Sequence, residues 1–283
     1  MKIEKGMKVL VTGAGSGIGR SVSVALARRG ANLFLTDINA AGLAETAELV
    51  KKAGGMVGKI QALDVSKFEQ VKSFAEDISK ESGAMDILMN VAGVALFALI
   101  EDMSHADWEK VINVNLWGPI HVLESFAPEM IKAKKGHILN VASIAGLVGG
   151  PWHAAYSTSK SGLVGLSEVL RYDLMQHNIG VTVICPGAVE TPLKQSTRIL
   201  GVDMESEEVK ELKEKFSERA VSPERVVELM LDAVEKNKFI VLTSFDVKLL
   251  YFLKYHFFQL YHYAVKQISR MINAIRYPEA KRA

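Results

Sequence analysis

Three residues in the middle of the chain have the types and the spacing needed to move a proton to or from a substrate oxygen. Lys160 follows Tyr156 by four residues, and Ser143 precedes the tyrosine by thirteen. In a helix, a spacing of four places two side chains on one face, one turn apart. A lysine ammonium there favours the phenolate, so a tyrosine whose ordinary pKa is about 10 becomes a base nearer neutrality. A serine hydroxyl from a neighbouring strand end would hold the substrate oxygen.

A Tyr-x-x-x-Lys pair also occurs as a half-exposed tyrosine beside a surface lysine, so its meaning depends on the N-terminal segment. Residues 7–12 form an apolar run that predicts a buried strand, and residues 21–30 predict a helix. The segment 13–19 between them reads Gly-Ala-Gly-Ser-Gly-Ile-Gly. Such a turn lets the backbone approach a pyrophosphate, and the helix N-terminus offers free N–H groups. The sequence therefore predicts nucleotide binding.

The second predicted strand, 32–37, ends in a carboxylate that indicates which dinucleotide is bound. Asp37 follows the glycines by about twenty residues, where a carboxylate accepts hydrogen bonds from the ribose hydroxyls and repels a 2′-phosphate. Neither arginine nor lysine stands at Ser16, Ile38 or Asn39 to bind that phosphate. We predict NAD rather than NADP. The alternative role of Asp37 is a turn residue that caps the next helix.

From about Lys5 to Thr243 the chain resembles the short-chain dehydrogenase/reductase family. The segments that carry the resemblance, in chain order, are Thr12-Gly-x-x-x-Gly17-x-Gly19, Asp64-Val65, Asn90-Val-Ala92-Gly93, the four residues Asn115, Ser143, Tyr156 and Lys160, and Pro186-Gly187 followed by Thr191. Val91 stands where the family has a second asparagine, a departure that touches no catalytic role.

The resemblance implies the residues of the site. The implied catalytic residues are Asn115, Ser143, Tyr156 and Lys160. The implied cofactor-binding residues are Thr12, Gly13, Gly15, Ser16, Gly17, Ile18, Gly19, Asp37, Ile38, Asp64, Val65, Asn90, Ala92, Gly93, Tyr156, Lys160, Pro186, Gly187, Val189 and Thr191. In the implied reaction the tyrosine takes the proton of a secondary alcohol and hydride passes to the nicotinamide. The lysine lowers the tyrosine pKa, the serine stabilises the developing charge and the asparagine maintains a proton relay.

The expected helix at 105–133 contains a proline at a position that bears on the proton relay. Ser104 and Asp107 predict a capping box at its start. Pro119 has no N–H, so the carbonyl of Asn115 loses its partner four residues on and could hold a water. In the family resembled, the corresponding asparagine holds a water that links the lysine to solvent. The alternative is that Pro119 only kinks the helix.

The expected substrate pocket is walled by 94–100, by 147–153 and by the segment after Pro192, and it is mostly apolar. The expected substrate contacts are Val94, Leu96, Ser143, Leu147, Trp152, His153 and Leu193. The alternative for the histidine is a loop residue facing water. Residues 203–219 are highly charged and predict a solvated helix with Val209, Leu212 and Phe216 facing inward. We interpret about 192–222 as a substrate lid.

Strands and helices alternate along the chain, which indicates a doubly wound α/β (Rossmann) fold. Strands are expected near 7–12, 32–37, 57–63, 85–90, 136–142, 180–185 and 239–243, with helices between them that include 105–133 and 152–177. We predict a seven-stranded parallel sheet covered by helices on both faces, with ligands at the carboxyl ends of the strands. Residues 1–243 would form this one domain, followed by a tail at 244–283.

The composition supports one large core and argues against disulfides and metals. The chain has 283 residues, of which 49% are hydrophobic. Its one cysteine, Cys185, ends an apolar run, so we expect a buried strand residue rather than a nucleophile. The seven histidines show no metal-ligand spacing, and no metal is expected. No apolar signal segment stands at the N-terminus, which predicts a cytoplasmic protein.

The tail from about Asp246 to Arg276 is aromatic and basic. Its polar residues recur mostly every three or four positions, as on one helix face, at Lys248, Tyr255, Gln259, His262, Lys266, Arg270 and Asn273. From Phe239 onward, seven basic residues face two acidic ones, which leaves 27 basic and 30 acidic residues in the rest of the chain. A basic tail therefore follows a slightly acidic body.

Three roles for this amphipathic tail compete. In the first, residues 246–276 lie in a membrane interface as a peripheral anchor. In the second, the tail packs on its own body or on a partner subunit. In the third, it binds nucleic acid. Phe and Leu outnumber the basic residues, so no nucleic acid is predicted. A spanning helix is not expected, because the longest stretch without charged residues, Tyr255 to Val265, is shorter than the roughly 20 residues required.

Together these features predict an NAD-dependent oxidoreductase that interconverts a secondary alcohol and a ketone on an apolar substrate, such as a sterol, a retinoid-like alcohol or a long-chain hydroxyacyl compound. One alternative is a 3-ketoacyl-type reductase, and another is a catalytically silent NAD-binding sensor or scaffold. Against the silent protein, all four tetrad positions hold competent residues. The resemblance also implies a homodimer or homotetramer, formed through the helices that hold Asn115 and Tyr156.

Overall fold

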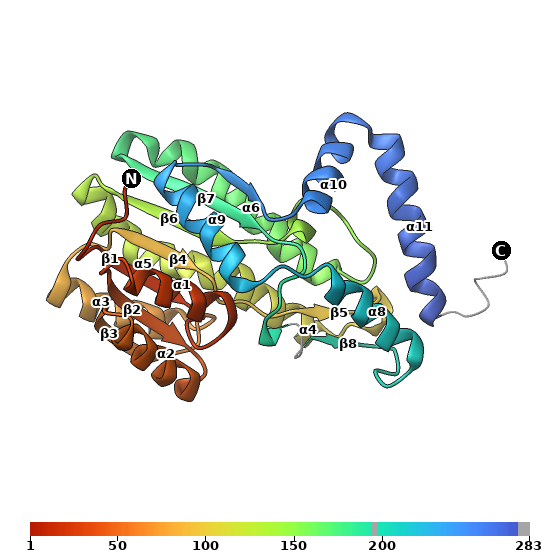
Figure 1. Cartoon of the computed structure of the whole chain (residues 1–283), viewed down its shortest axis with the longest axis horizontal. Coiled ribbons are helices and arrows are strands. Elements are labelled where there is room, and N and C mark those ends of the chain that lie inside the picture. Colours follow the sequence, from red (N-terminus) through yellow and green to blue (C-terminus); the bar gives the residue numbers. More distant parts are fainter. Residues whose placement is uncertain (194–196, 277–283) are drawn as a thin grey trace.

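The computed structural model describes residues 1–193 and 197–276, without the side chains of residues 215 and 216. Seven parallel strands of this part of the chain form one sheet in the order β3-β2-β1-β4-β6-β7-β9 (Figure 1). They are β1 (Lys8–Thr12), β2 (Asn32–Asp37), β3 (Met56–Ala62), β4 (Ile87–Asn90), β6 (Gly136–Val141), β7 (Ile179–Cys185) and β9 (Ile240–Leu242). The predicted seven-stranded parallel sheet is confirmed.

Two layers of helices cover the sheet, and the alternation of side chains along the strands serves both. On one face α1 (Gly17–Ala27), α2 (Ala40–Lys52) and α9 (Pro223–Glu235) share a core with Val9 and Val11 of β1. On the other face α3 (Phe68–Ser82), α5 (Gly118–Ala133) and α6 (Ala154–Asp173) pack with Leu10 from the same strand. Strands that are buried on both faces need apolar residues at nearly every position, and this agrees with the apolar runs in the sequence.

The expected helix at 105–133 is divided in the structure. The capping box of Ser104 and Asp107 is present at the start of α4 (His105–Ile112). A π-helical turn, Asn113–Trp117, follows, and α5 then begins with Pro119 in its first turn. The N–H of Gly118 donates to the carbonyl of Asn113, five residues back. A proline lacks the N–H that a regular ladder requires, and one wide turn accommodates it.

Shorter elements gather beyond the carboxyl ends of the strands. A two-stranded parallel sheet joins β5 (Leu96–Phe97) to β8 (Arg198–Ile199). The charged helix α8 (Glu207–Glu218) starts at Ser206, whose side chain caps it, and Val209 faces inward and is fully buried as expected. The side chain of Phe216 lies outside the described part of the structure.

The periodicity of the polar residues in the tail predicts a single helix face, but the tail forms two separate helices. The helices α10 (Phe245–His256) and α11 (Phe258–Arg276) pack against each other and stand at one end of the molecule (Figure 1). The chain turns at Phe257, whose φ of −137° and ψ of 58° are not helical. The turn lets Tyr261 fold back and become buried against Leu147. Among the described residues, none of the helices is both long and apolar enough to cross a bilayer.

Candidate active site

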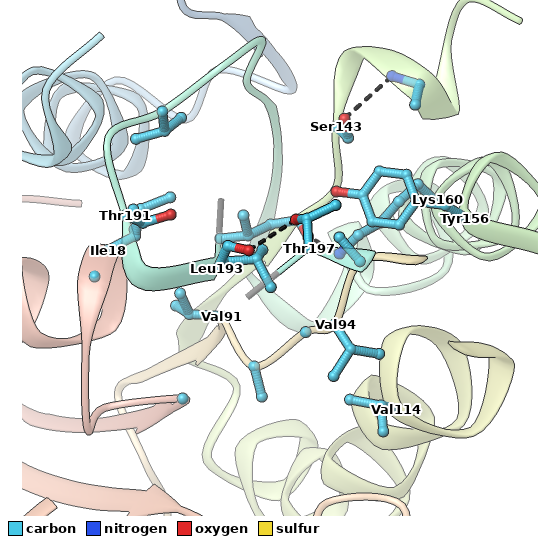
Figure 2. A pocket seen from close by; sticks show the side chains of 18 of the residues that line it. Ile18, Val91, Val94, Val114, Ser143, Tyr156, Lys160, Thr191, Leu193 and Thr197 are labelled. Carbon is cyan, nitrogen blue, oxygen red and sulfur yellow. Dashed lines mark hydrogen bonds between the residues drawn. The ribbon is translucent and has the colours of Figure 1, made fainter. Parts of the chain in front are cut away.

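A cavity of about 870 Å³ opens at the carboxyl ends of the strands and collects most of the predicted site. Figure 2 shows side chains from several elements pointing into it, with the hydroxyl of Tyr156 turned toward Ser143. The predicted residues that line the cavity are Gly13, Ser16, Gly17, Ile18, Gly19, Asp37, Ile38, Asp64, Val65, Ala92, Gly93, Val94, Ser143, Trp152, His153, Tyr156, Lys160, Pro186, Gly187, Val189, Thr191 and Leu193.

The glycine turn between β1 and α1 packs so closely against neighbouring backbone that two of its positions have no room for a side chain. A Cβ at Gly13 would lie 2.8 Å from the backbone of Ala92, and one at Gly19 would lie 2.0 Å from the carbonyl oxygen of Gly13. Thr12 holds the neighbouring strand end, because its hydroxyl accepts from the N–H groups of Val91 at 3.0 Å and Ala92 at 3.1 Å. This arrangement fits a dinucleotide whose pyrophosphate sits on the turn.

Asp37, at the end of β2, is tied to the glycine turn and does not cap the next helix. One carboxylate oxygen accepts from the N–H of Gly15 at 2.8 Å and the other from that of Asn39 at 2.8 Å. The cap of α2 is Asn39, whose side chain accepts from the N–H of Gly42 at 3.2 Å. Gly15 has no room for a side chain, because a Cβ there would lie 2.9 Å from the Asp37 carboxyl carbon.

The proton-transfer residues meet at the end of β6. Tyr156 and Lys160 lie one turn apart on α6, and the Lys160 ammonium, 5.9 Å from the Tyr156 ring centroid, donates to the carbonyl of Val141 at 2.8 Å. The Ser143 hydroxyl accepts from the N–H of Ala145 at 3.1 Å, which fixes it at the start of a short 3₁₀ turn. The helix and strand-end positions predicted from spacing are thus brought together.

The predicted lowering of the tyrosine pKa is wrong for the structure as it stands. Burial raises the pKa of Tyr156, and hydrogen bonding to Ser143 opposes the rise only in part. Burial also lowers the pKa of Lys160 to about 8, against the electrostatic influence of Cys185. Lys160 is buried and Tyr156 half-buried, and desolvation disfavours whichever form is charged. The phenol is therefore held as a proton donor in this state of the site.

Asn115 lies behind the cavity wall, fully buried, and holds two parts of the site together. Its Oδ1 accepts from the N–H of Val94 at 2.8 Å, and its Nδ2 donates to the carbonyl of Val94 at 2.9 Å. The same Nδ2 donates at 3.2 Å to Ser159, whose hydroxyl donates to the carbonyl of Tyr156 at 2.7 Å. Reasoning from the sequence missed Ser159, although it stands one helical turn after the tyrosine.

Asn90, another predicted cofactor residue, belongs to a buried polar chain behind the site. Its Nδ2 donates to Oδ1 of Asn140 at 2.9 Å, and Nδ2 of Asn140 donates to the hydroxyl of Ser167 at 2.9 Å. This chain joins β4 to β6 and α6, and the latter two position Ser143, Tyr156 and Lys160. These hydrogen bonds fix the relative position of the elements they join, although Oδ1 of Asn90 is buried without a partner among the described residues.

Two of the expected substrate contacts, Leu96 and Leu147, do not line the cavity. Leu96 is buried beside Val111 and Ala155, because side chains alternate along β5 and Phe97 is the one that faces the cavity. Leu147 is buried under Tyr261 of the tail. The cavity wall also includes Leu212, one of the residues expected to face inward from the charged helix, and three residues that no local pattern indicated, namely Ile199, Lys213 and Ile272.

His153 is half-buried in the cavity wall rather than a loop residue that faces water. Its ring packs on Phe97, with ring centroids 4.2 Å apart, and meets Tyr156 edge-on at 6.4 Å. Burial lowers the pKa of the histidine, and its hydrogen bond to the carbonyl of Pro151 opposes this only in part. The ring is therefore neutral near pH 7, and it forms part of the cavity wall beside the phenol.

Comparison with known proteins agrees with this geometry. The sequence profile described as short chain dehydrogenase matches residues 7–200. A 3-oxoacyl-[acyl-carrier-protein] reductase of Thermotoga maritima is 38% identical over 197 residues, which cover 69% of this chain and 78% of that protein. The chain belongs to the short-chain dehydrogenase/reductase family. It is an oxidoreductase that acts on CH–OH groups.

Solved structures of the family share the fold. A short-chain dehydrogenase/reductase of Burkholderia phymatum in complex with NAD superposes with a TM-score of 0.81 and 27% identity, covering 92% of this chain and 96% of that one. A metagenomic short-chain oxidoreductase in complex with NADP gives 0.69 and 30%, covering 85% and 96%. Neighbours of this fold thus bind either nicotinamide cofactor.

Proposed function

We propose that the protein is an NAD-dependent oxidoreductase that interconverts a secondary alcohol and a ketone on an apolar substrate. The observation that carries the proposal is the meeting, in one cavity, of the Tyr156–Ser143–Lys160 cluster with a bare glycine turn and a largely apolar wall. The first two are the parts that hydride transfer with proton exchange requires. The third sets the class of substrate.

The preference for NAD rests on Asp37 and on the state of the nearest arginine. The carboxylate stands at the end of β2 facing the cavity, next to Ile38, which is 73% exposed and brings no charge. Arg20, on α1, donates to the carbonyl of Gly15 at 2.6 Å and to Glu45 at 2.8 Å. Its guanidinium is therefore already engaged, and a 2′-phosphate would meet the negative charge of Asp37.

The chemistry of the site follows from where protons are held. The bound nicotinamide supplies or accepts the hydride. The glycine turn and Asp37 would hold its dinucleotide, and Lys160 would bind the nicotinamide ribose. In reduction the neutral phenol of Tyr156 donates its proton to the carbonyl oxygen while the hydroxyl of Ser143 steadies that oxygen. Oxidation is the reverse, with the proton of the alcohol returning to Tyr156.

The substrate class is inferred from the wall of the cavity opposite the glycine turn. The large apolar side chains there are Phe97, Trp152, Leu193, Ile199, Leu212 and Ile272. A wall of this kind favours a bulky apolar alcohol, with a sterol, a retinoid-like alcohol and a long-chain hydroxyacyl compound as the candidates. Because α8 and the neighbouring segment contribute to it, we also propose that 192–222 acts as a lid.

The second candidate is reduction of a 3-ketoacyl group. It is favoured by the likeness to a reductase that acts on 3-oxoacyl groups of a carrier protein. Lys110 and Lys213 line the cavity as well, and their charges would suit an anionic carrier arm. A 3-ketoacyl thioester and a long-chain secondary alcohol would use the same tetrad.

We also propose that the chain forms a homodimer or homotetramer through α4, α5 and α6. Large apolar side chains are exposed there: Trp117 at 47%, Val169 at 58% and Tyr172 at 65%. Light scattering after size-exclusion chromatography tests this, and replacing Val169 and Tyr172 by serine should shift the mass toward the monomer. A wild-type chain that is monomeric at all accessible concentrations would remove the proposal.

The test of the function is initial rates on a panel of secondary alcohols and ketones, followed by NADH absorbance, with NADP and NADPH in parallel. The panel runs from small diols through 3-ketoacyl thioesters to long-chain alcohols and sterols. Turnover of bulky apolar compounds with NAD supports the proposal. Turnover confined to 3-ketoacyl thioesters supports the second candidate, and tight NAD binding without any turnover favours the silent sensor.

A further inference from the structure

The tip of the α10–α11 hairpin exposes large aromatic and aliphatic side chains together. The residues concerned are Phe252, Tyr255, Phe257, Phe258, Leu260 and Tyr263, with Phe257 and Phe258 at 55% and 57% exposure. We call these six residues the hairpin tip. Exposed apolar clusters of this kind mark a surface that meets an apolar partner.

The exposed apolar side chains of α10 lie on a different side of the helix from those that pack in the core. On α10, Phe245, Leu249 and Phe252 follow each other at steps of four and three residues, and all three are exposed. The same helix packs Leu250 and Leu253 into the core cluster of β7 and α6. The hairpin thus has an inner apolar side that is covered and a second apolar side that is exposed.

The charge of the hairpin indicates what would cover this surface. Residues 245–276 contain five basic residues and one acidic residue. Lys254 donates to the carbonyl of Leu147, whereas Lys248, Lys266 and Arg270 are exposed. Exposed basic residues beside aromatic and aliphatic ones are the composition of helices that lie in the interface of an anionic bilayer. A second copy docked by a two-fold axis would bring the same basic surface against itself.

The hairpin is also part of the cavity wall. Ile272 of α11 lines the cavity and is buried, and Oδ1 of Asn273 accepts from the indole N–H of Trp152 at 2.9 Å. Trp152 lines the cavity too, with a backbone φ of 66°, a left-handed conformation that is unusual for a side chain of this size. In Figure 1, α11 runs from the hairpin turn toward α8.

We propose that the α10–α11 hairpin docks on an anionic phospholipid surface and that α11, as a wall of the cavity, brings the active site to substrate dissolved in that surface. The inference rests on the proposed function for its substrate, an apolar alcohol or ketone that partitions into lipid. The docking itself depends only on the hairpin. The basic residues draw the hairpin to the surface, and the hairpin tip enters the interface.

The docking test is co-sedimentation of the full chain with vesicles of phosphatidylcholine alone and of phosphatidylcholine with phosphatidylglycerol. One variant carries F257S, F258S and L260S, and a second carries K248E, K266E and R270E. The matched control carries L49S, M56S and I60S, three apolar residues that are exposed elsewhere, on α2 and β3. We expect wild type and control to bind the anionic vesicles, more weakly as salt rises, and each hairpin variant to lose at least tenfold in binding.

Two results overturn the docking. One is that wild type does not bind anionic vesicles, or that both hairpin variants bind them as tightly as wild type does. The other is a wild-type dimer that dissociates in the hairpin variants by light scattering while no vesicles are bound, which would make a second copy the occupant. Circular dichroism and turnover of a small water-soluble alcohol establish that each variant is folded and active.

The same preparations separate failure of the docking from failure of the proposed function. Turnover of water-soluble alcohols without any vesicle binding contradicts the docking and leaves the proposed function in place. Vesicle binding with no turnover of any alcohol or ketone contradicts the proposed function instead. If both hold, a long-chain secondary alcohol presented in anionic vesicles should be turned over at least severalfold faster by wild type than by either hairpin variant.

Discussion

The buried Lys160 ammonium gives a prediction for stability against pH that can be worked from the structure. Burial lowers the pKa of Lys160 from 10.5 to about 8. Below pH 8 the lysine is charged in both the folded and the unfolded chain, and the folded state carries the desolvation cost. Between pH 8 and 10.5 the unfolded chain binds one more proton than the folded chain, so the free energy of unfolding rises with pH. At about 1.4 kcal/mol per pH unit, the rise amounts to about 3 kcal/mol.

The perturbation is Lys160→Met, which keeps an unbranched side chain one atom shorter than lysine and removes the charge. Other groups titrate in the same range: burial raises the pKa of Cys185 to about 12 and also raises that of Tyr156, and both make the folded state lose stability above pH 9 to 10. These contributions are shared by the two proteins, so the difference between them isolates the lysine. Because Cys185 acts on Lys160 electrostatically, the pair is also measured on a Cys185→Ala background.

The assay is urea unfolding of wild type and variant at several pH values from 7 to 10.5, followed by circular dichroism. Lys160→Met should be the more stable protein at pH 7, by about 3 kcal/mol less the hydrogen bond to Val141, which is worth about 1.5–3 kcal/mol for a charged donor. At about 0–1.5 kcal/mol this advantage is smaller than the pH-dependent contribution, so the difference should change by about 3 kcal/mol and wild type should become the more stable protein as pH rises to 10.5. A difference in unfolding free energy that is flat across this range would show that the buried lysine is not desolvated as the structure indicates.

Three further predictions concern activity. Replacing Asp37 by serine and Ile38 by arginine should move the ratio of kcat/KM for NAD over NADP by at least tenfold toward NADP, and initial rates with both cofactors would show an unchanged ratio if the carboxylate plays no part. Ser159→Ala should lower kcat by about tenfold with little change in KM, because it cuts the link from Asn115 to the tyrosine backbone. Ser159→Thr keeps the hydroxyl and should retain most activity. Equal losses of kcat in both variants, or a change in KM alone, would contradict this positioning role. Asn273→Leu leaves the Trp152 indole N–H without its acceptor and should raise KM for bulky apolar alcohols severalfold more than for small ones, and a uniform change across the panel would refute the coupling.

The parts of the fold that could be predicted are those written in local patterns. The strands 7–12 and 32–37 are apolar runs bounded by glycine or aspartate, and both were placed to within a residue. The capping box of Ser104 and Asp107 is likewise a local signal that the structure confirms. Helical spacing links Tyr156 to Lys160, whereas Asn115 could be named only through the family resemblance, because it lies in a π-helical turn that no local pattern announces.

The rest depended on contacts that join distant parts of the chain. Phe257, where the tail turns back, is flanked by aromatic residues and has neither glycine nor proline beside it to announce a break. Ile272 enters the cavity wall more than one hundred residues after Tyr156, so no periodicity links the two. The raised pKa of Tyr156 likewise follows from desolvation of the phenol in the finished fold, which the spacing to Lys160 does not reveal.

The central claim is that the phenol of Tyr156 exchanges the proton with the substrate oxygen, and Tyr156→Phe tests it most directly. The substitution removes one oxygen and leaves the ring on its neighbour Phe97. The measurement is kcat with the best alcohol of the panel, together with NAD affinity by calorimetry. We predict a fall in kcat of about 10²–10⁴, the range of general acid–base catalysis, with NAD affinity unchanged within a few-fold. Turnover within a few-fold of wild type would contradict the account.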